Sequence, residues 1–180
     1  MTRDPRARHK STGDFEISLV NEQSRHPVDE EELCEAARAV LTDSRFDSAT
    51  LSIAVVDDPS IHELNRRYLD HDWPTDVLSF VLDEQGNHLK GEVIISAETA
   101  ARAAAEAGWP TAAEQLLYVI HGTLHLVGYR DKTPTDAEQM RRAEAKYLRQ
   151  LGFDLSRSDD DRAAPDESAV NQAHGGATAW

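Results

Sequence analysis

Two histidines inside an apolar, helix-length segment constrain this chain more than any other feature. His121 and His125 are four residues apart, so in an α-helix they lie on one face, one turn from each other. Their neighbours are almost all apolar: Leu116, Leu117, Tyr118, Val119, Ile120, Leu124, Leu126 and Val127. A helix that is apolar on nearly all sides is buried. Two buried imidazoles need polar partners, because an unpaired buried polar group costs several kcal/mol.

The residues that follow complete the pattern H-x-x-x-H-x-x-G-x-x-D. Gly128 can end the helix in a left-handed conformation, and Asp131 can then return to the two histidines. Two imidazoles and one carboxylate make a three-ligand site with an open fourth position, which is typical of catalytic zinc. The alternative is a hydrogen-bonded pair of core histidines. We predict a metal site at His121, His125 and Asp131 with one zinc ion, although this ligand set also suits Fe(II) or another divalent metal.

Gly122 helps to distinguish this motif from that of a metalloprotease. In the metalloprotease helix H-E-x-x-H, a glutamate directly follows the first histidine and acts as the general base. Here that position is Gly122, which serves either close helix packing or room for a substrate or a metal-bound water. A metalloprotease-like hydrolase is therefore an alternative without its usual base.

The hydropathy pattern predicts an α/β (α+β) fold, with a four-stranded mixed sheet and about five helices. The metal site lies on a buried helix and the turn after it. We expect Asp58 and Thr111 to cap two of the helices. The expected strands are 15–20, 50–56, 76–82 and 92–96, with a loop over 83–91, and the expected helices are 28–42, one from residue 58, 96–107, 111–128 and 135–151.

Composition indicates the bounds of the folded domain and the compartment in which it works. The folded domain is expected over 14–153, with a disordered arm at 1–13 and a disordered acidic tail at 154–180. No apolar run is long enough to span a membrane. Residues 1–11 lack the apolar core of a secretory signal, and the single Cys34 fits a reducing compartment. We therefore expect a cytoplasmic protein.

The net charge limits the partners. The formal net charge of −14 argues against broad, non-specific nucleic-acid binding, which depends on neutralising phosphates. No DNA partner is expected. A local basic groove for RNA is compatible with this charge.

Three further segments accompany the histidine motif in a fixed order. They read L-N-R-R-Y at 64–68, P-T-D-V-L-S-F at 74–80 and G-E-V-I-I-S at 91–96. Alone, each fits ordinary strand or helix chemistry. Together with 121–131 they resemble the YbeY family of endoribonucleases, and four ordered motifs are far more specific than one.

The resemblance implies a zinc-dependent endoribonuclease that acts on single-stranded RNA. It implies a role in maturation of the 3′ end of small-subunit ribosomal RNA and in ribosome quality control, with ribosomal RNA and the small ribosomal subunit as partners. The metal would lower the pKa of a water molecule and polarise a phosphoryl oxygen. A third alternative is a non-enzymatic ribosome-assembly factor in which the metal is structural.

This chain departs from the family pattern at two positions. The resembled family holds its zinc with three histidines, and Asp131 stands where it has the third. Leu69 stands where the family commonly has an arginine linked to catalysis or RNA contact, and neither Arg66 nor Arg67 is assigned that role. No catalytic residue is assigned: Asp76 could be a general base, but it suits the entry to a strand equally well.

Overall fold

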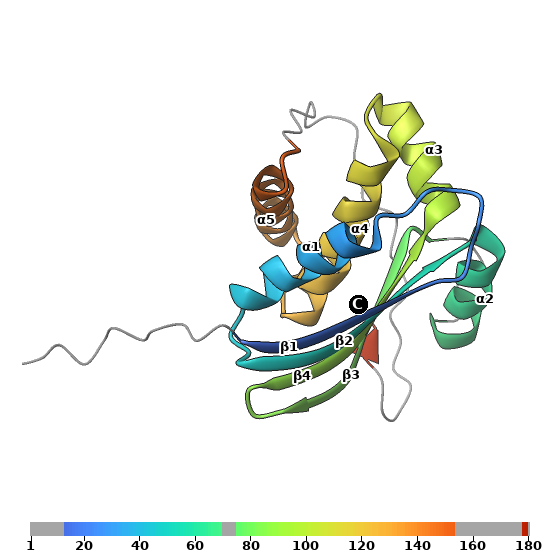
Figure 1. Ribbon diagram of the computed structural model, residues 1–180. Helices are drawn as coiled ribbons and strands as arrows, with labels where there is room; N and C mark the ends of the chain where they lie inside the picture. Colours follow the sequence, from blue (N-terminus) through green and yellow to red (C-terminus); the bar gives the residue numbers. More distant parts are fainter. Residues whose placement is uncertain (1–12, 70–74, 154–177, 180) are drawn as a thin grey trace, which may run out of the picture.

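The computed structural model describes residues 13–69, 75–153 and 178–179, which form one sheet with helices packed against it (Figure 1). Nothing is described for residues 1–12, 70–74, 154–177 and 180. The strands are β1 (Asp14–Asn21), β2 (Ser48–Val56), β3 (Val77–Gln85), β4 (His88–Ser96) and the two-residue β5 (Thr178–Ala179). The helices are α1 (Glu30–Thr42), α2 (Asp58–Leu69), α3 (Ala97–Ala107), α4 (Thr111–Leu126) and α5 (Pro134–Gln150).

The sheet is mixed, with the strand order β1-β2-β4-β3-β5. β1, β2 and β4 are parallel, and β3 runs antiparallel to β4. The predicted four-stranded mixed sheet with five helices is confirmed. β5 adds a short antiparallel strand at the free edge of β3, where Thr178 and Ala179 lie opposite Val81 and Phe80.

Helix α4 lies at the centre of the molecule. Its side chains are buried from Ala113 to Leu126 apart from His121, because α4 packs on the sheet and is flanked by α1, α3 and α5. Alternate residues of β4 serve the two faces of the sheet: Val93 and Ile95 belong to the core under α4, whereas Ile94 belongs to a smaller cluster with Ile61 of α2.

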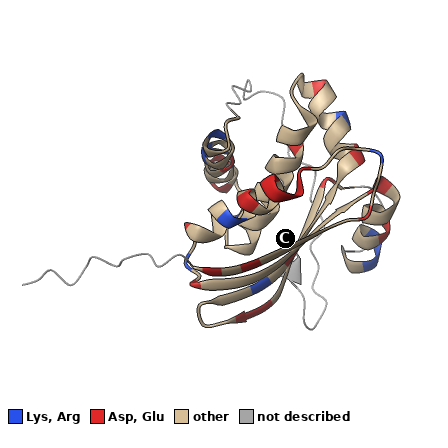
Figure 2. Cartoon of the chain, viewed as in Figure 1, with Lys and Arg blue, Asp and Glu red and all other residues tan. Residues whose placement is uncertain are grey.

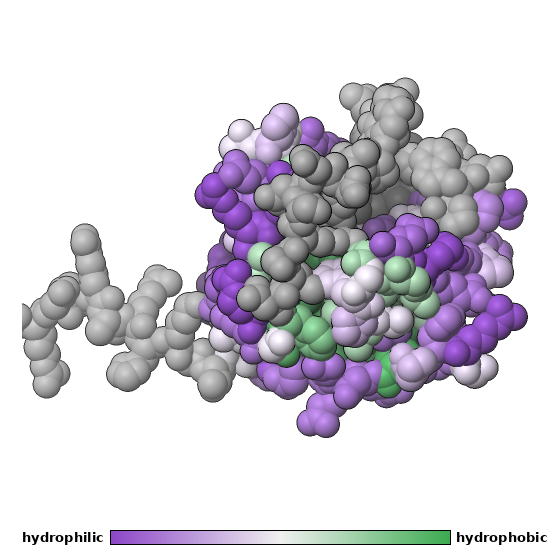
Figure 3. Space-filling view, turned by 90° about the horizontal axis from the view of Figure 1, so that it is seen from above, coloured by the Kyte–Doolittle hydropathy of each residue, from purple (hydrophilic) through white to green (hydrophobic). Residues whose placement is uncertain are grey.

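Hydrophilic side chains dominate the rim of the face seen from above, with hydrophobic ones nearer its centre (Figure 3).

Two expected helix caps are wrong. The side chain of Asp57 accepts the Ser60 N–H at 3.0 Å, so the cap of α2 is one residue earlier than Asp58. α4 is preceded by Pro110, which has no side-chain cap, and Thr111 is already helical. A proline before a helix is itself extended and breaks the preceding segment, so a capping hydroxyl is not needed to start α4.

The loop expected over 83–91 is also wrong. β3 and β4 continue through it as a hairpin that turns at Gly86 and Asn87. Gly86 has φ +60°, a left-handed conformation that glycine adopts without a steric penalty. The polar residues of this stretch lie on an exposed strand end, where hydropathy does not mark a strand.

The remaining expectations concern the two ends of the chain and the membrane. The arm (1–13) and the tail (154–180) lie outside the described residues, except for Gly13 and β5. None of the described helices has the length and apolar character needed to cross a bilayer.

Candidate metal centre

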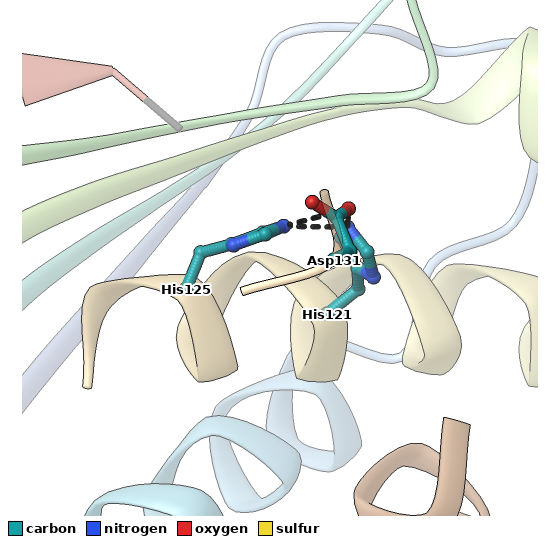
Figure 4. Close-up of side chains that lie close together, drawn as sticks. All are labelled: His121, His125 and Asp131. Atoms are coloured by element: carbon teal, nitrogen blue, oxygen red, sulfur yellow. Dashed lines mark hydrogen bonds and ion pairs between the residues drawn. The ribbon is translucent and has the colours of Figure 1, made fainter. Parts of the chain in front are cut away.

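His121 and His125 project from the same face of α4, as their spacing predicts (Figure 4). Gly122 lets this helix approach the sheet closely. A Cβ atom at Gly122 would lie 2.8 Å from Cγ1 of Val93 and 3.1 Å from Cγ2 of Val77. Gly122 therefore serves close helix packing, and it leaves no space for a substrate.

The turn after α4 brings the carboxylate of Asp131 to the two imidazoles. Val127 caps the helix, and Gly128 follows with φ +107°. The N–H of Gly128 donates to the carbonyl of His125 at 3.0 Å, and that of Tyr129 donates to the carbonyl of Leu124 at 3.0 Å. These bonds satisfy carbonyls at the end of the helix and reverse the chain, so that Asp131 faces both histidines.

The three predicted ligand residues come together. Nε2 of His121 and Nε2 of His125 lie 2.9 Å apart, and Oδ2 of Asp131 lies 3.8 Å and 3.4 Å from them, respectively. In a tetrahedral zinc site with bonds of about 2.0–2.1 Å, the ligand atoms are about 3.3–3.4 Å apart. The triangle of donor atoms therefore has the size that one such ion needs.

Hydrogen bonds at the other ring nitrogens favour the same conclusion. Nδ1 of His121 lies 2.6 Å from Oε1 of Glu144, and Nδ1 of His125 lies 3.1 Å from the backbone oxygen of Tyr129. A carboxylate and a carbonyl oxygen accept hydrogen bonds, so each Nδ1 carries the proton. Both Nε2 lone pairs then converge on the Asp131 carboxylate. Three converging acceptors require a cation or a proton between them, and the site fits a divalent ion.

The charges around the site shift the pKa values of two of its groups, His121 and Asp131. Burial of the His121 ring lowers its pKa, but the carboxylate of Glu144, with smaller effects from Asp76 and Asp131, outweighs burial and raises the pKa above its ordinary value. In the absence of a metal ion, the contact with His125 lowers the pKa of Asp131 against the opposing effect of burial. The site therefore favours a carboxylate at Asp131 and positive charge beside it.

The site is open on one side. The side chain of His125 is 7% exposed, whereas that of His121 is 24% and that of Asp131 is 39% exposed. One histidine is thus anchored in the core, while the other two groups face solvent. A ligand could approach from their side.

Glu144 is a site residue that the sequence analysis missed. It lies on α5, is 5% exposed, and follows Met140 by one helical turn on the inward face of that helix. An acidic residue on the apolar face of an amphipathic helix was the available signal.

The other motif segments differ in their relation to the site: Asp76 acts on it through its charge, whereas α2 packs on the opposite face of the sheet from α4. The carboxylate of Asp76 accepts the N–H of Val77 at 2.9 Å, as a strand-entry residue does, and its charge also acts on His121. On α2, Asn65 is buried, while Arg66, Arg67 and Tyr68 are exposed. In the cartoon of Figure 2, basic residues lie at this end of α2, while acidic residues are spread over the other helices and strands.

An α+β domain that gathers two histidines and a carboxylate at the end of a buried helix defines a protein with a candidate metal site. The family model described as Endoribonuclease YbeY matches residues 18–152. This chain belongs to the YbeY family.

Individual relatives agree with this assignment. A protein named Endoribonuclease YbeY from Syntrophotalea carbinolica is 43% identical, over 72% of this chain and 89% of its own. One of the same name from Rhodopirellula baltica is 40% identical, over 76% and 71%, and one from Rhodococcus opacus is 34% identical, over 86% and 93%.

A solved structure has the same fold. The solution structure of a Thermotoga maritima protein superposes with a TM-score of 0.52 at 22% identity, and covers 83% of this chain and 99% of its own. The likeness supports the α+β architecture.

Proposed function

We propose that this chain is a metal-dependent endoribonuclease that hydrolyses phosphodiester bonds in single-stranded RNA, with zinc as its ion. The observation that carries the proposal is the convergence of the two Nε2 atoms and Oδ2 of Asp131, in a chain whose relatives bear the name endoribonuclease. We further propose that it acts in the cytoplasm on ribosomal RNA of the small subunit. The resemblance of its motifs suggests 3′-end maturation and ribosome quality control.

The three residues of the site differ in burial, and this sets the side from which each would bind an ion. His125 would hold the ion from the core side, whereas His121 and Asp131 would hold it from the solvent side, where RNA would approach. An ion held there would polarise a phosphoryl oxygen and make water more acidic. The negative charge of Asp131 moderates this effect relative to a neutral third ligand. Asp76 is the acid to test first as a general base, because its charge acts on His121.

The end of α2, which packs on the other face of the sheet from α4, offers contacts for a single strand of RNA outside the metal centre. Tyr68 is 58% exposed, and its ring packs edge-on against Phe80 at 5.7 Å between centroids. The guanidinium of Arg67 lies 5.7 Å from the Tyr68 ring centroid. An exposed aromatic ring beside arginines suits base stacking and phosphate contact. In a chain with a net charge of −14, such a local patch would steer RNA.

Cleavage assays separate this proposal from the two alternatives. Zinc-loaded protein is incubated with a labelled single-stranded RNA, with the same RNA as a duplex, and with casein. We expect cleavage of the single strand alone, and its loss in His125→Ala. The matched control is His88→Ala, a histidine of β4 that pairs with Ser48 and is not one of the three candidate ligands. Cleavage of casein but not of RNA would favour a metalloprotease-like hydrolase.

A deletion strain tests the assembly-factor alternative. We expect wild type to rescue ribosomal RNA processing and His125→Ala to fail. Rescue by a His125→Ala protein that cleaves no RNA would instead favour a non-enzymatic ribosome-assembly factor.

A further inference from the structure

Glu144 is a buried acid that the proposed hydrolysis does not itself require. It lies on α5 among the apolar residues of that helix, with 5% of its surface exposed. A carboxylate in such surroundings is costly unless it has strong hydrogen bonds. Its bond to Nδ1 of His121 is 2.6 Å long, slightly shorter than the usual range of about 2.7–2.9 Å for charge-assisted N–H···O bonds.

This bond determines how the His121 ring is presented. A carboxylate can only accept, so it retains the ring proton on Nδ1 and leaves the lone pair on Nε2. It also fixes the rotation of the ring, so that Nε2 points towards His125 and Asp131. The His125 ring is held in the same tautomer by the carbonyl of Tyr129. The two histidines of α4 are therefore oriented by two different elements, α5 and the turn after α4.

We propose that Glu144 is the positioning residue of the metal centre, which orients His121 and fixes its tautomer from α5. This inference rests on the proposed function only in its use of a metal at His121, His125 and Asp131. It makes the packing of α5 against α4 part of metal binding, because a carboxylate on one helix presents a ligand on the other. Outer partners of ligating histidines typically change metal affinity by about 10–100-fold.

Glu144→Gln tests the positioning role with little change in volume. We expect zinc affinity, measured by competition with a fluorescent chelator, to fall by about 10–100-fold. The matched control is Glu138→Gln on the same helix, an exposed acid paired with Arg142, which should retain wild-type affinity. Thermal unfolding of both variants without metal checks that they are folded. Wild-type zinc affinity in a folded Glu144→Gln protein would overturn the proposal.

A second measurement does not depend on the variant. Long-range nitrogen–proton NMR correlations of the metal-free wild type report which ring nitrogen of His121 carries the proton. We expect protonated Nδ1, and protonation at Nε2 alone would overturn the proposal even if Glu144→Gln fails to fold. Wild-type protein that binds zinc but cleaves no RNA would contradict the proposed function and leave the role of Glu144 standing. An unchanged zinc affinity in Glu144→Gln, together with normal RNA cleavage, would contradict the role of Glu144 and leave the proposed function standing.

Discussion

Nε2 of His121 and Nε2 of His125 face each other at 2.9 Å. The other nitrogen of each ring, Nδ1, has a hydrogen-bond acceptor, which is Glu144 for His121 and the backbone oxygen of Tyr129 for His125. Two neutral imidazoles in this arrangement repel each other through their lone pairs. A cation between them removes the repulsion, so metal binding should stabilise the folded chain. We expect the midpoint of thermal unfolding to rise with zinc in wild type and to stay constant in His121→Ala. An equal rise in both proteins would point to binding elsewhere.

Replacement of Asp131 by histidine should preserve the metal. His is a normal zinc ligand, and it is the residue that the resembled family has at this position. An imidazole is neutral, so the ion keeps more of its charge and acidifies water more strongly. In Asp131→His we expect the pH at half-maximal RNA cleavage to move downwards. Asp131→Ala is the comparison, with weakened metal binding. A shift upwards in Asp131→His would contradict the electrostatic role of Asp131.

Gly122→Ala should destabilise the fold. The added Cβ would lie 2.8 Å from Cγ1 of Val93, and overpacking of this kind costs about 1–3 kcal/mol. The better helix propensity of alanine returns about 1 kcal/mol. We expect a net loss of about 1 kcal/mol in urea unfolding. Gly108→Ala, where the left-handed φ of +69° opposes substitution but the added Cβ meets nothing within 4 Å, separates backbone strain from overpacking. Unchanged stability in Gly122→Ala would contradict the close packing.

The residues of the metal centre and its surroundings illustrate what the sequence can predict and what it cannot. The spacing of His121, Gly128 and Asp131 follows from helix and turn geometry, so the clustering of the candidate ligands could be predicted from local rules. The role of Gly122 depends on how closely α4 approaches Val93, which is a tertiary distance. Glu144 was missed for the same reason, because helical spacing marks it as inward but does not identify its partner across the α4–α5 interface. The Gly86–Asn87 turn carried a local signal, a two-residue hairpin motif, which the polar strand ends obscured.

Asp58 should make stability depend on pH. Burial raises the pKa of its carboxyl, but hydrogen bonds from Ser96, Thr99 and Arg102 outweigh burial and lower it. A lowered pKa in the folded state contributes stability above the unfolded value of about 3.9, and this contribution is lost as the pH falls through the folded value.

Asp58→Asn should therefore cost about 2 kcal/mol near pH 7, and this cost should shrink as the pH falls through the folded-state pKa of Asp58. Urea unfolding of wild type and variant across this range measures the difference. The control is Asp47→Asn, since that carboxylate pairs with exposed Asn87 and, within the part of the chain that the structure describes, has no cationic partner. A difference that is independent of pH would contradict the electrostatic account of Asp58.

Arg67→Ala should weaken RNA binding without changing metal affinity. Loss of one phosphate contact should reduce the salt dependence of binding, the slope of log K against log salt, by about one. Arg45→Ala is the matched control, since its guanidinium also stacks on the next residue, 4.3 Å from the Phe46 ring centroid. Fluorescence anisotropy with single-stranded RNA measures both. Equal effects of the two substitutions would mean that α2 does not hold the RNA.

The metal content of the purified protein tests the central claim most directly. Protein prepared without chelator, dialysed against zinc and then against buffer, is analysed for metal beside Asp131→Ala and His125→Ala. We predict about one ion per chain in wild type, in keeping with a single three-ligand site, and much less in both variants. Wild-type protein without bound metal, or variants with the wild-type content, would contradict the assignment of His121, His125 and Asp131 as a metal centre.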